Sequence, residues 1–132
     1  MKTVFTSEKA TIMVHPEKRM VHHQIHKFIC NDEFRNFMMK GADTFEQNRC
    51  NKWLSDDRGN SALKQDDVEW AQKNWEPRIL KAGWKYWAIV MPEKIVGQLS
   101  MKSLVKRYSD MGVTVQVFSE SDKAMSWLNT VH

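Results

Sequence analysis

The chain has 132 residues, of which 42% are hydrophobic and 27% are charged, and its formal net charge is +4. These values are typical of a globular chain with its own core, so we expect one domain over residues 1–132. The basic residues are spread along the chain, which argues against nucleic acid as a partner, and no apolar run reaches the length of about 18 residues of a bilayer-spanning helix, which argues against a membrane partner.

The first half of the chain is predicted to open with an antiparallel hairpin. Strand patterns over residues 11–15 and 20–29 are joined by a short turn around Pro16. Apolar residues then recur at helical spacing from residue 31 to about residue 48, which predicts a helix capped by Asn31. Residues 52–55 are predicted to form a short strand, and a polar loop that includes Asn60 follows it.

The second half alternates helices with strands. A helical pattern covers residues 66–82, and Pro77 either kinks this helix or starts a second one, because proline lacks the backbone N–H. The nearly continuous apolar run 84–91 predicts a central strand that is covered on both faces. A further helix, a strand at 113–118 and a last helix from Ser121 complete the chain.

The predicted order is β-β-α-β-α-β-α-β-α. Strands that alternate with helices after an opening hairpin indicate a mixed sheet whose later strands are parallel. We therefore expect an α/β domain with a mixed five-stranded sheet, an N-terminal β-hairpin and about four helices.

Charged side chains follow the strand predicted at 52–55, at the place where open α/β sheets bind their ligands. Adjacent carboxylates on an extended chain point in different directions, so a shared metal or general-base site is harder to build than an ion pair of Asp56 or Asp57 with Arg58 or Arg78. The second predicted helix contributes an arginine and a tryptophan as neighbours. The candidate ligand- or partner-binding residues are Asp56, Asp57, Arg58, Trp70 and Arg78.

Neither the cysteines nor the histidines form a recognised catalytic or metal-binding motif. Cys30 and Cys50 have no metal-type spacing, which favours two free thiols in a reducing cytoplasm. On the predicted strand, His22 and His26 are roughly 13 Å apart, and His22 and His23 face opposite sides. We therefore expect no metal, no cofactor and no catalytic residue.

The chain resembles the SpoIIAA-like superfamily, which includes STAS and SEC14-type domains, and within it small bacterial proteins. The similarity lies in the strand end 53–58, in Trp-Glu-Pro-Arg at 75–78, in 88–92 and in the helix 124–128. It implies a small sheet with packed helices that acts by binding. STAS domains carry a phosphorylated serine in the region of 55–61, which here contains Ser55 and Ser61, but Asp-Asp-Arg-Gly replaces their Asp-Ser-Ser/Thr-Gly motif.

These features predict a non-enzymatic, cytoplasmic binding or regulatory module that associates with itself as a homodimer or with a protein partner. The alternative is a small-molecule-binding or anion-binding protein, or an enzyme, that uses the cluster Asp56, Asp57 and Arg58. A ligand would require a cleft near this strand end, whereas a partner would require an exposed apolar patch.

Overall fold

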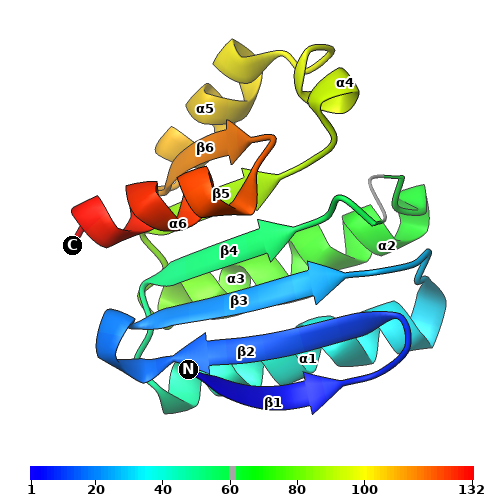
Figure 1. Cartoon of the computed structure of the whole chain (residues 1–132), viewed down its shortest axis with the longest axis vertical. Helices are drawn as coiled ribbons and strands as arrows, with labels where there is room; N and C mark the ends of the chain where they lie inside the picture. Colours follow the sequence, from blue (N-terminus) through cyan, green and yellow to red (C-terminus); the bar gives the residue numbers. More distant parts are fainter. Residues whose placement is uncertain (60–61) are drawn as a thin grey trace.

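The computed structural model, which describes residues 1–59 and 62–132, contains one mixed sheet with helices on both faces (Figure 1). The strands lie side by side in chain order: Lys2–Thr6 (β1), Ala10–His15 (β2), Met20–Ile25 (β3), Lys52–Asp56 (β4), Tyr86–Val90 (β5) and Thr114–Phe118 (β6). Strands β1 to β3 pair antiparallel, and β3 to β6 pair parallel. The predicted α/β class, the hairpin β2–β3 and the parallel later strands are confirmed.

The predicted count of five strands is wrong, because β1 adds a sixth strand at the edge of the sheet. The register between β1 and β2 shifts between Thr3 and Phe5, and the adjacent residues Val4 and Phe5 are both half-buried. A bulge of this kind breaks the alternation of inward and outward side chains by which a strand is recognised in a sequence. Asn60 of the predicted loop, and Ser61, lie outside the described residues.

The helices divide between the two faces of the sheet. In chain order they are Asn31–Gln47 (α1), Gln65–Trp70 (α2), Glu76–Lys81 (α3), Glu93–Val96 (α4), Met101–Ser109 (α5) and Ser121–Thr130 (α6). Helices α1 and α3 cover one face, and α6 covers the other (Figure 1). The single helix predicted between β5 and β6 is two helices, α4 and α5.

A π-helical turn, Ala71–Trp75, connects α2 to α3 without a break in the helical path. Pro77 lies in the first turn of α3 and has no N–H to donate to the preceding turn. Pro77 therefore occupies the first turn of α3, as predicted, but α3 continues the path of the preceding helix rather than starting a separate one. The π-helical turn itself has no signal in the sequence pattern.

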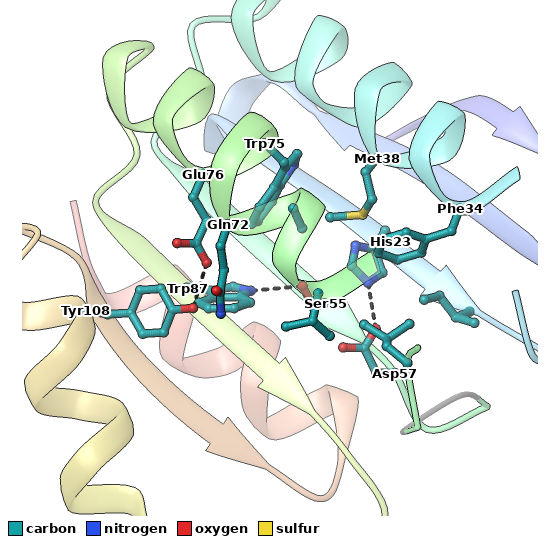
Figure 2. A pocket seen from close by; sticks show the side chains of 14 residues that line it. His23, Phe34, Met38, Ser55, Asp57, Gln72, Trp75, Glu76, Trp87 and Tyr108 are labelled. Atoms are coloured by element: carbon teal, nitrogen blue, oxygen red, sulfur yellow. Dashed lines mark hydrogen bonds and ion pairs between the residues drawn. The ribbon is translucent and has the colours of Figure 1, made fainter. Parts of the chain in front are cut away.

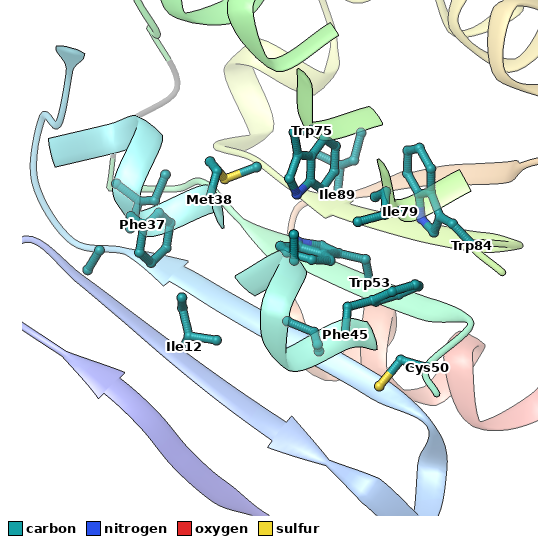
Figure 3. Close-up of a cluster of buried hydrophobic side chains, with 14 of the residues drawn as sticks. Ile12, Phe37, Met38, Phe45, Cys50, Trp53, Trp75, Ile79, Trp84 and Ile89 are labelled. Atoms are coloured by element: carbon teal, nitrogen blue, oxygen red, sulfur yellow. The ribbon is translucent and has the colours of Figure 1, made fainter. Parts of the chain in front are cut away.

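The main core lies between the sheet and the helices α1, α3 and α5 (Figure 3). Aromatic side chains dominate it: Phe34, Phe37, Phe45, Trp53, Trp75 and Trp84 are all buried. A smaller core forms where Ala124 and Leu128 of α6 pack on Leu54, Ala88 and Val90. The prediction that the fourth strand pattern is covered on both faces is confirmed, because Ile89 of β5 faces the main core while Ala88 and Val90 face α6.

The first turn of α1 is held by a carboxylate from α2. Asp67 is fully buried and accepts the backbone N–H of Asn31 at 2.9 Å and Arg35 Nε at 3.2 Å. The side chain of Asn31 makes no capping bond and instead accepts Lys64 Nζ at 2.8 Å. The predicted cap by Asn31 is therefore wrong, because a carboxylate distant in sequence takes that role at the positive end of the helix dipole.

Gly41 lies where α1 crosses Trp53. A Cβ atom at this position would be 2.5 Å from Trp53 Cη2, and Trp53 is fully enclosed, with Trp75 and Phe45 beside it. Alanine normally stabilises a helix interior by about 1 kcal/mol relative to glycine. Here we expect Gly41→Ala to lower the free energy of unfolding by about 1–2 kcal/mol, because the core is overpacked.

Urea denaturation of both proteins measures this effect, with Gly97→Ala as the control. A Cβ at Gly97 would be 3.7 Å from the Glu93 carbonyl oxygen, which is ordinary van der Waals contact, and Gly97 already has right-handed helical backbone angles. Gly97→Ala should therefore leave stability unchanged or raise it by about 0.5 kcal/mol. Equal effects of the two substitutions would contradict the steric argument.

Candidate functional site

A cavity of about 120 Å³ lies between the face of the sheet that carries the main core and the helices α1, α2 and α5, together with the π-helical turn (Figure 2). Its walls are largely aromatic and apolar, with Phe34, Trp75, Trp87 and Tyr108 among them. The polar side chains that line it are His23, Ser55, Asp57, Gln72 and Glu76. The cavity therefore combines an apolar enclosure with a few polar groups, which is the usual composition of a small-molecule site.

A chain of two hydrogen bonds orients Asp57 at this cavity. Trp53 Nε1 donates to His23 Nδ1 at 3.0 Å, and His23 Nε2 lies 2.7 Å from Asp57 Oδ1. An indole N–H can only donate, so His23 Nδ1 must accept and the imidazole proton must lie on Nε2. His23 is then a neutral ring that donates to Asp57, and both of its nitrogens are occupied.

Two further hydrogen-bond donors at the cavity already have acceptors within the protein. Trp87 Nε1 donates to Ser55 Oγ at 2.9 Å, and the Tyr108 hydroxyl donates to Glu76 Oε2 at 2.7 Å (Figure 2). Burial raises the pKa of Glu76, although the bond from Tyr108 and the charge of Arg107 oppose that shift. Burial, together with the bond to Glu76, raises the pKa of Tyr108. Tyr108 therefore stays a neutral hydroxyl donor.

Asp56 lies on the opposite face of the sheet from Asp57. Its carboxylate binds Arg58 in a bidentate pair, with Nε to Oδ1 at 2.9 Å and Nη2 to Oδ2 at 2.7 Å. Burial disfavours the charged form of Asp56, but the hydrogen bonds and charge of Arg58 outweigh it and lower the pKa of this carboxyl. The predicted ion pair with Arg58 is confirmed, and the three residues of the strand-end cluster do not converge on one site.

The predicted bridge from Arg78 to Asp56 or Asp57 is wrong. Arg78 Nε donates to Glu46 Oε2 at 2.9 Å, and its Nη2 also pairs with Asp43 of the same helix, α1. The helical run from α2 to α3 starts at the carboxyl ends of the strands and returns toward their amino ends (Figure 1). Arg78 lies near the end of that run, so it has left the strand-end region.

Trp70 is not among the side chains that line the cavity. It is half-buried, and the guanidinium of Arg35 lies over its ring, 5.6 Å from the ring centroid. This geometry is that of a cation–π contact, which accounts for the tryptophan without a ligand.

The sequence pattern indicated Asp57 but not the groups that surround it, which are His23, Ser55, Glu76, Trp87 and Tyr108. One signal was available: Trp53, Ser55 and Asp57 are alternate residues, so they share one face of an extended chain. The partners on the neighbouring strands depend on the pairing register, which puts His23 opposite Ser55.

The histidines and cysteines show no arrangement for metal binding within residues 1–59 and 62–132, where no group of three or more potential ligands occurs. His22 and His23 face opposite sides, as predicted: His22 stacks on His15 at a centroid distance of 6.1 Å, whereas His23 faces the cavity. The two free thiols are confirmed, and burial raises the pKa of Cys50 to about 12.

No helix in the described part of the chain has the length and apolar character needed to cross a bilayer. Comparison of the chain with protein-family models, with curated proteins and with solved structures gives no match. The SpoIIAA-like resemblance therefore stays a prediction, while the α/β class and the mixed six-stranded sheet are what the structure shows.

Proposed function

We propose that this protein is a non-enzymatic binding or regulatory module whose ligand site is the cavity beside His23, Ser55 and Asp57. The observation that carries the proposal is the location of this cavity. It lies where β3 and β4 end, and open α/β sheets bind ligands outside the carboxyl ends of parallel strands. The cytoplasmic setting and the homodimer stay predictions from the sequence.

The hydrogen bonds around the cavity favour binding over catalysis. A serine nucleophile needs a base that accepts its proton, and among the described residues Ser55 Oγ makes no hydrogen bond to such a base: its bond to Trp87 is one that it accepts. His23 is the histidine that lines the cavity, and both of its ring nitrogens already form hydrogen bonds, one to Trp53 and one to Asp57. The alternative of an enzyme that uses Asp56 together with Asp57 loses support, because these carboxylates lie on opposite faces of the sheet.

The size of the cavity limits the ligand. A buried apolar cavity of roughly 150 Å³ is known to bind benzene. The volume of about 120 Å³ here suits a single small ring or a short aliphatic chain. Such a ligand would pack against Trp75, Trp87 and Phe34 and would bury most of its surface.

The proposal is tested by an NMR screen of small ring compounds, from benzene-sized to indole-sized, against the purified chain. We expect several compounds to shift the indole N–H signal of Trp87 and the amide signal of Gln72, since both residues line the cavity. Ala71 also lines the cavity, so Ala71→Leu should fill it and weaken binding about tenfold or more.

Ala82→Leu is the matched control, because Ala82 packs against the same core but does not line the cavity. This variant should keep the binding of the wild type. The proposal fails if no compound binds, or if Ala71→Leu folds and binds as well as Ala82→Leu. Product formation by the purified protein from any bound compound would contradict the non-enzymatic part.

A further inference from the structure

We infer that the ligand of the cavity is a small organic cation, a protonated primary amine on a ring-sized apolar body, and that Asp57 pairs with its ammonium group. The inference rests on the proposed function, since it names the ligand class of the same cavity.

Most hydrogen-bond donors of the residues that line the cavity already donate to acceptors within the protein. The indole N–H of Trp87, the hydroxyl of Tyr108 and the Nε2–H of His23 donate to Ser55, Glu76 and Asp57 respectively. The hydroxyl hydrogen of Ser55 and the side-chain NH₂ of Gln72 are the polar hydrogens left among these groups. Carboxylate oxygens of Asp57 and Glu76 remain as acceptors, so the cavity favours a ligand that donates.

The indole N–H of Trp75 does not change this balance. Its nitrogen is fully enclosed and has no hydrogen-bond partner among the described residues. The ring meets Trp53 in a T-shaped contact, with centroids 4.9 Å apart and planes at 84°. A fully enclosed nitrogen offers no contact to a molecule in the cavity.

Among the described residues, no lysine or arginine pairs with the carboxylate of Asp57. Asp56 is neutralised by the bidentate guanidinium of Arg58, whereas Asp57 receives only the neutral imidazole of His23. Among the described residues that line the cavity there are two carboxylates and no lysine or arginine. The side chain of Asp57 is 14% exposed, and a carboxylate this far from water gains from a neighbouring cation.

The second carboxylate reinforces the sign of the charge in the cavity. Glu76 has Arg107 at 3.6 Å from Oε1, but Arg107 is half exposed and is not among the lining residues. Burial raises the pKa of Glu76, so we assign the contact with the ammonium group to Asp57 rather than to Glu76. An anion would meet repulsion from both groups.

The residues that line the cavity suit an organic cation rather than a metal ion. The rings of Trp87, Tyr108 and Trp75 line the space, and an ammonium group over an aromatic ring gains about 0.5–2 kcal/mol by cation–π attraction. A bare metal ion would need several oxygen or nitrogen ligands, and no such group of side chains occurs in the described residues. An amine on an apolar body satisfies both the carboxylate and the rings.

Three probes of nearly equal size but different charge test the inference: benzylamine, benzyl alcohol and benzoate, each titrated into the chain by NMR near neutral pH. We expect benzylamine to bind at least about tenfold more tightly than benzyl alcohol, and benzoate to bind more weakly than either. Asp57→Asn keeps the acceptor for His23 Nε2 but removes the charge. It should abolish the preference for the amine and leave the affinity for benzyl alcohol unchanged.

Asp110→Asn is the matched control, because it removes one carboxylate at an exposed position on the surface. It should keep the preference of the wild type for the amine. Equal binding of amine and alcohol to the wild type would overturn the inference and leave the proposed function intact, as would an Asp57→Asn variant that still prefers the amine. Failure of all three probes would also overturn it, and the ring-compound screen then decides separately whether the cavity binds anything.

Discussion

Acidification from pH 7 to pH 4 is expected to lower the free energy of unfolding by about 3 kcal/mol through His22 alone. His22 is 8% exposed, and its Nε2 is buried without a hydrogen-bond partner. Burial lowers the pKa of His22 from 6.5 to about 4, and the nearby His23 and His15 add to the shift. Asp56 opposes it only in part.

The sign follows from proton binding in the two states. Between pH 6.5 and about 4 the unfolded chain binds a proton at this histidine and the folded chain does not. The contribution of His22 to the free energy of unfolding is therefore fully present above about pH 6.5, and it is lost as the pH decreases toward about 4. Burial also lowers the pKa of His15, which adds in the same direction. Glu76 acts in the opposite direction, because its pKa in the folded state is raised.

Urea denaturation at several pH values, on the wild type and on His22→Leu, measures this contribution. The leucine variant should lose about 3 kcal/mol less stability between pH 7 and pH 4 than the wild type does. His26→Leu is the control, because His26 is exposed and its Nε2 bonds Thr11 Oγ1 at 2.9 Å. A variant without His22 that keeps the full acid sensitivity would show that other groups cause it.

The strands and helices were largely predictable because their signals are local. A nearly continuous apolar run marked β5, helical spacing marked α1, and the alternation of helices with strands implied the parallel pairing. The edge strand β1 was missed because its bulge destroys the local alternation. The π-helical turn was missed because it changes the path of a helix without changing its composition.

Only the part of the site that lies on a single strand was predictable from the sequence. Alternation along the chain placed Asp56 and Asp57 on different faces, which is what the structure shows. The partner of Asp57 comes from β3, and a register shift of one residue would have put His22 there in place of His23. Arg78 was misplaced for a related reason, since its distance from the strand end depends on where the helical run begins and in which direction it returns.

Trp53→Phe is expected to lower the free energy of unfolding by about 2–4 kcal/mol. The indole is fully buried among Phe45, Trp75 and Gly41, so a smaller ring leaves a cavity in the main core. It also removes the N–H that His23 Nδ1 accepts. Urea denaturation measures the loss, and the same substitution should make Gly41→Ala less costly, because the atom that the new Cβ would meet is gone.

The same variant separates the role of Trp53 in packing from its hydrogen bond to His23. The indole N–H holds the ring hydrogen of His23 on Nε2, where it donates to Asp57. Phe45→Leu is the control, because Phe45 packs against Trp53 and forms no bond to His23. We expect Trp53→Phe to change the nitrogen chemical shifts of the His23 ring, whereas Phe45→Leu should lose stability and keep those shifts. Unchanged nitrogen shifts in Trp53→Phe would show that the indole does not determine which nitrogen of His23 carries the hydrogen.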